Sequence, residues 1–391
     1  MSISRLKEIF EEKFWICGEV FDEAALSEPI SLLYELPIYY LNSALEAART
    51  TTGEPFTFLV GYVRNGTFNA AACDTEYGGL VCLHASVPYL LFMACVNYAT
   101  RCDLETALPK VQDGMLIIYD DKITLPGRLA DIDITPAKLT RNFEEFCHSL
   151  QTAERKDDVF QYGLFLYEIG IRFIVMHECM HIILGHTAYL RKKLGMNLLI
   201  EISSQREENL HKKLNQALEF LADRNTVCGI LVQALDGNLL HSYGNNIPEF
   251  IKVDFSTFIA RSVVQAICIL MHQFPYKLEN NLDSSLLKTH PHPYVRMQWM
   301  NTEMGNHVVG EEQFAEKIVL PFGYAMATLA NNFVTPNSWA DVNKENIDYS
   351  EKEMFSDFSY EYISGCAQKL QNEMWNLAPV YEGFIRGWRY N

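Results

Sequence analysis

Three histidines and one glutamate interrupt an otherwise apolar segment, VMHECMHIILGHT, at residues 175–187. In an α-helix, residues four positions apart lie on the same face, so His177 and His181 are expected to point in one direction, with Glu178 beside them. This is the H-E-x-x-H pattern, in which two imidazoles bind zinc and the glutamate takes the proton of a zinc-bound water. The alternative is a pair of core histidines beside a surface glutamate. The presence of a third metal ligand in the chain would favour the zinc site over this alternative.

A third metal ligand is expected from a later helix. The metzincin pattern is excluded, because it requires a histidine six residues after His181 and Thr187 occupies that position. The segment NQALEFLADRNTV, residues 215–227, instead places Glu219 in apolar surroundings, where an unpaired carboxylate would be costly. Asp223 follows on the same helical face and can accept the free N–H of a zinc-bound histidine. A solvated helix face is the alternative for this pair, and other carboxylates that stay open as ligands are Glu201, Glu207 and Glu208.

Together these motifs resemble those of a known group of enzymes. H-E-x-x-H followed by E-x-x-A-D, here Glu219–Asp223, is similar to the gluzincin metallopeptidases, and most similar to the HtpX and CAAX-prenyl endopeptidase type. The segment HECMHIILGH matches the H-E-x-x-H-x-x-x-G-H helix of that group. The segment THPHPYVRM places His290, Pro291 and Arg296 in the register of its H-P-x-x-x-x-R motif. A looser likeness in architecture is to the soluble phage-exclusion peptidase type called Lit.

The resemblance implies a zincin-like fold, a Zn²⁺ cofactor and a role for each matched residue. Glu178 would act as the general base toward a zinc-bound water, while His290 would donate a hydrogen bond to the oxyanion. Arg296 would orient the H-P segment or add positive charge. His292 competes with His290 for the donor role, because a second H-P pair begins at position 292.

A small sheet is expected over residues 56–85. The apolar runs FNAAAC and GGLVCLHAS are weakly similar to the paired strands of the same group, and the dipeptide Asn65-Gly66 is a strong hairpin signal. The strand over residues 68–73 is predicted to be an exposed edge that binds an extended peptide, with Asn69 in contact with the substrate. The alternative is that its alanines pack beneath a helix.

These elements predict an α+β protein that is mostly helical. The helix with the H-E-x-x-H motif is expected over residues 159–185, ended by Gly185, and the helix with the third ligand over residues 207–235. Residues 1–330 are predicted to form one zincin-like metallopeptidase domain. Residues 331–391 are predicted to form a helical C-terminal extension.

Composition restricts the class of protein. The chain has 391 residues and a net charge of −17, which argues against a nucleic-acid partner. Its ten scattered cysteines, without a C-x-x-C pair, indicate reduced thiols in the cytoplasm, and no signal peptide is recognised at the start. Residues 164–184 and 255–274 are long apolar stretches, but both contain ionisable or polar groups that lipid disfavours. The prediction is a soluble protein with no membrane span, although members of the resembled group lie in membranes.

The predicted function is that of a zinc-dependent endopeptidase that cleaves a cytosolic protein, in the form of a regulated host-defence or toxin-like protease. The alternative from another class is a catalytically silent zincin scaffold that acts as a sensor or binding module. A deformylase is disfavoured, because its separate cysteine-containing ligand motif is absent. A regulatory partner or trigger is expected, because an open protease would damage its host, and residues 331–391 are the predicted site of control.

Overall fold

The computed structural model describes residues 3–45, 56–76, 78–113, 115–117, 123–124, 134–150, 155–194, 199–200, 209–236, 248–274, 293–334 and 360–374. Within these residues the protein is mostly helical with small β-sheets, which confirms the α+β, mostly helical class. The helices are α1 (Ile3–Phe14), α2 (Ile30–Leu45), α3 (Ser86–Ala99), α4 (Pro136–Ser149), α5 (Lys156–Ile183), α6 (His186–Leu194), α7 (Asn209–Leu235), α8 (Phe255–Gln273), α10 (Pro293–Met304), α11 (Glu311–Phe314), α12 (Leu320–Asn332) and α14 (Tyr360–Met374), with a 3₁₀ turn η1 (Glu23–Ala25) and π-helical turns η4 (Gly305–Val309) and η5 (Ala315–Val319).

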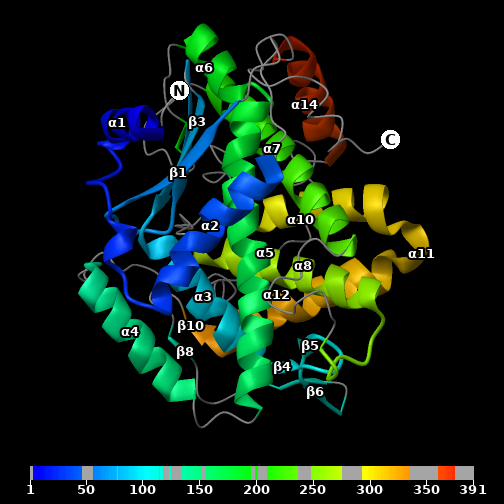
Figure 1. The fold of residues 1–391 in the computed structure, drawn as a ribbon. Coiled ribbons are helices and arrows are strands. Elements are labelled where there is room, and N and C mark those ends of the chain that lie inside the picture. Colours follow the sequence, from blue (N-terminus) through cyan, green and yellow to red (C-terminus); the bar gives the residue numbers. More distant parts are fainter. Residues whose placement is uncertain are drawn as a thin grey trace.

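The central element is α5, which runs through the middle of the molecule in Figure 1. The helix begins with Asp157 and Asp158, acids that favour a helix N-terminus, and its last turn is followed by Gly185 at a φ of 80°. Glycine adopts this left-handed conformation without strain, so the predicted end of the helix at Gly185 is confirmed. Gly163 lets α5 approach α3 closely, because a Cβ atom there would lie 2.6 Å from Val96 Cα.

One four-stranded sheet lies beside α5, in the order β1 (Phe58–Val63), β3 (Gly78–His84), β2 (Ala70–Thr75) and β9 (Leu199–Ile200). β3 is parallel to β1 and antiparallel to β2. The predicted sheet over residues 56–85 is therefore present. Short two-residue strands elsewhere are β4 (Cys102–Asp103), β5 (Leu108–Pro109), β6 (Val111–Gln112), β7 (Met115–Leu116), β8 (Ile123–Thr124) and β10 (Phe333–Val334).

The hairpin predicted at Asn65-Gly66 is wrong. The strands on either side of this dipeptide, β1 and β2, do not pair with each other, because β3 lies between them. Asn65 instead stabilises a turn: its Oδ1 accepts hydrogen bonds from the Thr67 amide and hydroxyl, and its Nδ2 donates to the Cys17 carbonyl. The dipeptide thus joins β1 to a strand two places away in the sheet.

The predicted free edge at residues 68–73 is also wrong where β2 meets β9. Ala71 and Ala72 pair with Ile200 and Leu199, so their backbone groups face another strand of the same chain. β9 has only two residues, which is too short to produce an alternating pattern in the sequence. The alanines of β2 are buried, which agrees with the alternative that they pack beneath helices.

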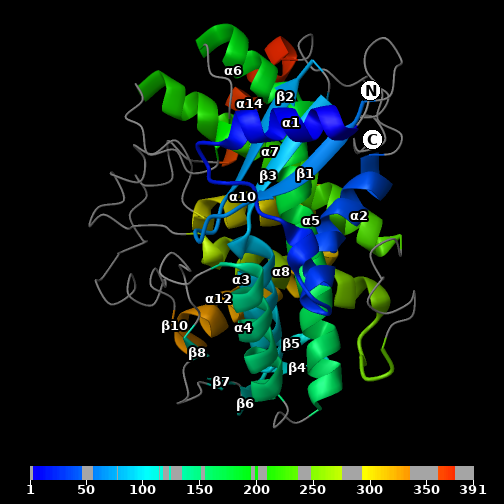
Figure 2. The same ribbon diagram turned by 60° about the vertical axis from the view of Figure 1, so that its left-hand side comes forward.

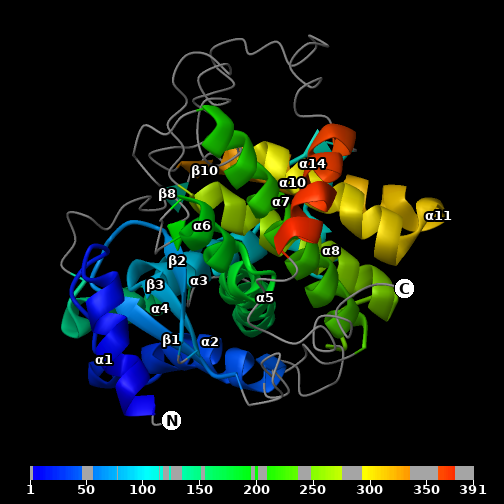
Figure 3. The ribbon, with the colours of Figure 1, turned by 90° about the horizontal axis from the view of Figure 1, so that it is seen from above.

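Helices cover both faces of the sheet (Figures 2 and 3). The face that includes Val60, Ala72 and Val81 joins the main core, to which α5 contributes much of its length. The opposite face packs on α1 through a smaller cluster that includes Phe10 and Leu80. On the far side of α5 from the sheet lie α7, α8 and α10 (Figure 3), so α5 is enclosed between the sheet and a layer of helices.

The predicted C-terminal extension is described in part, at residues 331–334 and 360–374. α14 packs against α7, and its buried residues Ile363, Ala367 and Met374 belong to the same core cluster as α5. β10 pairs with β8, which precedes α4. The described part of the extension thus shares its core with the preceding residues.

Two helices, α5 and α8, have the length and composition to cross a membrane. Their most apolar windows are 83% and 89% buried within the protein. Core helices of soluble proteins pass the same test, so two such helices are weak evidence for a span. The cytoplasmic location stays a prediction.

Candidate metal centre

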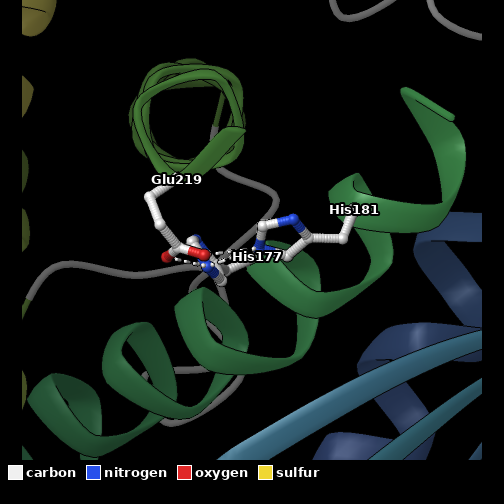
Figure 4. Close-up of side chains that lie close together, drawn as sticks. All are labelled: His177, His181 and Glu219. Atoms are coloured by element: carbon white, nitrogen blue, oxygen red, sulfur yellow. Dashed lines mark hydrogen bonds and ion pairs between the residues drawn. The ribbon is translucent and has the colours of Figure 1, made fainter. Parts of the chain in front are cut away.

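Side chains from two helices converge at the candidate site (Figure 4). His177 and His181 extend from α5, and Glu219 extends toward them from α7. The two histidine Nε2 atoms are 3.0 Å apart, Glu219 Oε2 lies 3.3 Å from His177 Nε2, and Glu219 Oε1 lies 3.4 Å from His181 Nε2. Because one ligand atom from each residue lies within 4.8 Å of the others, these three residues could hold a metal ion.

Asp223 lies one helical turn after Glu219 on α7, behind His177. Its Oδ1 atom is 3.0 Å from His177 Nδ1. A histidine that binds a metal through Nε2 carries its proton on Nδ1, and a carboxylate at this distance accepts that proton and fixes the orientation of the ring. The structure therefore places Asp223 where the predicted supporting role requires it.

Arg296, from the first turn of α10, joins the two carboxylates of α7. Its Nε and Nη2 each donate a hydrogen bond of 2.8 Å to Asp223, and Nη2 lies 3.5 Å from Glu219 Oε2. All three residues are buried, so water cannot solvate the two carboxylates. The positive charge of Arg296 stabilises them in its place. Arg296 is therefore a positioning residue that holds Asp223 and Glu219.

These contacts change the titration of the buried groups. Burial alone would lower the pKa of His177, but the hydrogen bonds and charges of Asp223 and Glu219 outweigh burial and raise the pKa to about 10. For Asp223 burial acts to raise the pKa, while the charge and hydrogen bonds of Arg296, followed by those of His177, lower it below its usual range. Without a metal, the proton on His177 offsets part of the negative charge of Asp223 and Glu219.

Replacing Arg296 with methionine is expected to destabilise the fold, because Asp223 and Glu219 would stay buried without their cation. Loss of one partner from a buried ion pair costs about 3–5 kcal/mol. Urea denaturation in the presence of a chelator measures the free energy of unfolding. Arg296→Lys is the control: it keeps the charge but not the two parallel hydrogen bonds, so its loss should be smaller. Equal stability of Arg296→Met and the wild type would contradict the assigned role.

His186, the last residue of the segment HECMHIILGH, is a part of the site to which the sequence motifs assigned no role. It begins α6, immediately after Gly185, and is completely buried. Its Nδ1 atom is 2.9 Å from His181 Nδ1. Burial lowers the pKa of His186 to about 3, so the ring is neutral and can accept a hydrogen bond. The sequence did contain a signal for this residue, because His186 and the preceding Gly185 are the last two positions of the matched segment HECMHIILGH.

The contact assigns tautomers to both rings. If His181 binds a metal through Nε2, its Nδ1 carries the proton and donates it to His186 Nδ1. His186 then carries its own proton on Nε2, which has no hydrogen-bond partner among the described residues. His186 supports His181 in the way that Asp223 supports His177, but with a neutral acceptor instead of a carboxylate.

We expect His186→Phe to weaken zinc binding by about 10- to 100-fold, the usual effect of removing a group that orients a metal ligand. Zinc affinity is measured by competition with a chromophoric chelator. His186→Asn should recover much of the affinity, because its Oδ1 occupies the position of Nδ1 and accepts the same proton. His272→Phe is the matched control, since His272 is an equally buried histidine outside the cluster. If all three variants bind zinc equally well, the assigned role of His186 fails.

Glu178 follows His177 on α5 and is 1% exposed. It is close enough to Cys82 of β3 for its charge to act on that thiol: burial is the main cause that raises the pKa of Cys82, and the charge of Glu178 contributes to it. A carboxylate beside a candidate metal ligand, and sheltered from bulk water, is suited to proton transfer. Glu178 is thus buried next to His177 along α5, and its role as the general base stays a prediction.

Other residues named from the sequence are placed less directly. Asn69 is buried immediately before β2, where its Oδ1 accepts a hydrogen bond from the Ala70 amide, so this oxygen is used within the sheet. Residues outside the described part of the chain include His290, His292, Glu201, Glu207 and Glu208. The choice of oxyanion donor between His290 and His292 stays a prediction.

The site is closed to solvent. Its six principal side chains are each at most 3% exposed: His177, Glu178, His181, Glu219, Asp223 and Arg296. A metal ion bound by two imidazoles and a carboxylate fits between these side chains. A peptide substrate would also need an opening from the solvent to the metal. The geometry therefore supports metal binding directly, and catalysis only with a movement that opens the site.

Comparisons with protein-family models, with curated proteins and with solved structures gave no match to this chain. The likeness to the gluzincin peptidases therefore rests on the matched motifs of the sequence. The geometry of the site supports a metal centre independently of that likeness.

Proposed function

We propose that this protein is a zinc-dependent endopeptidase of the gluzincin type, acting on a protein or peptide substrate. The observation that carries the proposal is the convergence of His177, His181 and Glu219, with Glu178 next to the first ligand on α5. Two imidazoles and one carboxylate are the ligand set of hydrolytic zinc sites that leave one position for the reacting molecules.

The distances between the ligand atoms fit zinc. Tetrahedral zinc with bonds of about 2.0–2.1 Å places its ligands about 3.3 Å apart. The observed separations of 3.0, 3.3 and 3.4 Å among the Nε2 and carboxylate atoms are close to that value. No large movement of these side chains is required for a zinc ion to bind.

The charges of the site fit a divalent ion as well. Glu178, Glu219 and Asp223 are three buried carboxylates, and Arg296 is the buried cation held between two of them. A dication and neutral histidines would bring three positive charges against three negative ones. Since an uncompensated charge is expensive in a buried site, this balance favours Zn²⁺ over a neutral occupant.

The residues of the chain divide the proposed reaction between them. Zinc, when bound, supplies a Lewis acid that polarises the scissile carbonyl and makes a water molecule more acidic. Glu178 accepts the proton of the attacking water and returns it to the leaving amine. Asp223 and His186 hold the two histidine rings in the required orientation, and Arg296 balances the carboxylates behind them. By resemblance, His290 donates to the oxyanion.

Access to the site is the regulated step in this proposal. All of the ligands are buried, so a substrate must be admitted by displacement of a covering element. α14, the described helix of the predicted extension, packs on α7, the helix that carries Glu219. A partner that binds residues 331–391 could therefore act on the site through α7.

The decisive experiment combines metal analysis with substrate mapping. Purified protein should contain about one zinc per chain, the stoichiometry of a single three-ligand site. New amino termini should appear in proteins from cells that express the wild type and be absent with Glu178→Gln. Zinc retained after His177→Ala with His181→Ala would refute the metal site. The same cleaved termini in the Glu178→Gln cells would refute the role of Glu178.

Zinc affinity is expected to rise with pH. His177 has a pKa of about 10 without a metal, so at neutral pH its proton must leave before Nε2 can bind zinc. Release of one proton per zinc raises the apparent affinity by up to about ten-fold per pH unit, until the pH reaches that pKa. Calorimetry in buffers of different ionisation enthalpy counts the released protons. Zinc binding without proton release would contradict the assigned contacts of His177.

Burial of the ligands favours one second candidate, a metal-binding module without catalytic activity. A closed site suits an ion that stabilises the fold or reports on metal concentration. The same experiment separates the two functions: bound zinc with no cleaved protein in wild-type cells supports the module. The presence of Glu178 supports the peptidase, because a structural zinc site does not require that carboxylate.

A further inference from the structure

A second cluster of reactive side chains lies on the α1 side of the sheet, away from the metal centre. Cys82 and His84 occupy alternate positions of β3, so they share one face of the sheet. Cys17, in the turn after α1, is held over that face by the 2.8 Å hydrogen bond from Asn65 Nδ2 to its carbonyl oxygen. Cys17 and Cys82 belong to the same buried cluster, and both are free thiols.

The orientation of His84 is fixed by Thr67. His84 Nδ1 is 3.0 Å from the Thr67 carbonyl and 2.9 Å from the Thr67 hydroxyl. The carbonyl can only accept, and the hydroxyl donates its own proton to Asn65 Oδ1 at 2.9 Å. Nδ1 must therefore carry a proton, which leaves Nε2 as the nitrogen that can take up a proton from a neighbouring group.

Cys17 packs in the same cluster as Cys82, and hydrogen bonds through Asn65 and Thr67 connect its backbone to the His84 ring. The hydrogen bond with Cys82, followed by that with His84 and its charge, outweighs burial and lowers the pKa of Cys17 to about 5. Burial instead raises the pKa of Cys82 well above its ordinary value. Cys17 is thus the thiolate and Cys82 the thiol of the cluster. His84 is the base, and Thr67 orients its ring.

Exposure distinguishes the two sulfur atoms. Cys17 is 8% exposed and directly follows Trp15 and Ile16, which are 74% and 62% exposed, so it lies close to the surface. Cys82 is completely buried. This arrangement suits a nucleophilic thiol with a resolving partner, since a reactive cysteine needs both thiolate character and access.

We propose that Cys17 is the reactive thiol of a peroxide-sensitive site, with His84 as its base and Cys82 as the partner in a reversible disulfide. His84 Nε2 takes the proton of the Cys17 thiol, the thiolate attacks one oxygen of hydrogen peroxide, and the O–O bond breaks as the sulfenic acid forms. The leaving hydroxide takes that proton back from His84 and departs as water. The Cys82 thiol then attacks the sulfenic sulfur, and water leaves as the S–S bond closes. Two thiols are oxidised and one peroxide is reduced to two water molecules. Neither step uses the metal centre.

The test is stoichiometric treatment of the purified full-length chain with hydrogen peroxide. The expected product has lost the mass of two hydrogen atoms, carries a Cys17–Cys82 cross-link in peptide mapping, and returns to its original mass with dithiothreitol. In Cys82→Ala the reaction should stop at a Cys17 sulfenic acid that dimedone traps. Cys73→Ala is the matched control: Cys73 lies in the same cluster, but burial and the charge of Asp74 raise its pKa to about 11, so the cross-link should still form.

A second measurement tests the base. Alkylation of the folded protein by iodoacetamide at mildly acidic pH should modify Cys17 at least about ten-fold faster than the half-buried Cys147, whose pKa is raised by burial. His84→Asn keeps a donor toward Thr67 but lacks Nε2, so it should slow alkylation of Cys17 by about ten-fold while circular dichroism is unchanged. Oxidation that begins at another cysteine, or equal Cys17 rates in the wild type and a folded His84→Asn, would overturn the proposal. Either result leaves the metal centre untouched.

Discussion

Glu178→Gln is expected to reduce peptide cleavage by about a thousand-fold or more while the zinc content stays at its wild-type value. Glutamine has the size and shape of glutamate but cannot accept a proton from the attacking water, and general-base catalysis with metal assistance accounts for an effect of this scale. Cleavage is measured with a substrate identified by terminal-amine mapping, and zinc by elemental analysis of the same preparation.

Glu168→Gln is the matched control for this result. Glu168 lies on the same helix and is 3% exposed, but it is not a member of the metal cluster. A folded Glu168→Gln variant should cleave at nearly the wild-type rate. Activity that survives in Glu178→Gln would remove the peptidase proposal, even if the zinc site were intact.

Glu219→Gln is expected to weaken zinc binding by at least about a hundred-fold, more than the loss of a supporting group would. A neutral amide is a poorer zinc ligand than a carboxylate, and the change also removes one of the charges that balance the dication. Competition with a chelator gives the affinity. Asp223→Asn should be intermediate, with a loss of about 10- to 100-fold, because it supports a ligand without binding the ion.

Glu303→Gln provides the comparison for general effects of changing a buried acid. Glu303 is 1% exposed and contacts Arg224 and His307, each at 3.0 Å, on the far part of α10. This variant should bind zinc with the affinity of the wild type. Equal zinc affinity in Glu219→Gln and wild type would show that the third ligand is another residue.

The sequence predicted those parts of the site that depend on local periodicity. His177 and His181 share a face because they are four residues apart on a helix, and Glu219 and Asp223 repeat that spacing on a second one. The end of α5 follows from a local signal, Gly185 after its last turn, whereas the helix begins at Lys156, before the predicted start at residue 159. The mostly helical α+β class follows from the same periodicity.

Residues without such a signal were missed or given a wrong partner. Asn65-Gly66 predicted a hairpin, because a dipeptide cannot indicate that β3 inserts between the two strands that it connects. β9 closed the predicted edge with only two residues. His186 was given no role, because it lies beyond the predicted end of the helix at Gly185, and only the turn there brings its Nδ1 atom to 2.9 Å from His181 Nδ1.

Amino-acid spacing by itself thus paired His177 with His181 and offered Glu219 as one of several third ligands, since helical periodicity is a property of neighbours in the chain. Only the tertiary structure decided how those residues are supported and enclosed. Packing of α7 on α5 and of α10 on α7 places Asp223 and Arg296 behind the ligands and buries the site, while packing of α1 on the opposite face of the sheet brings Cys17 over β3. These contacts join residues far apart in sequence, and their geometry is fixed by the packing of side chains in the core, which no local pattern encodes.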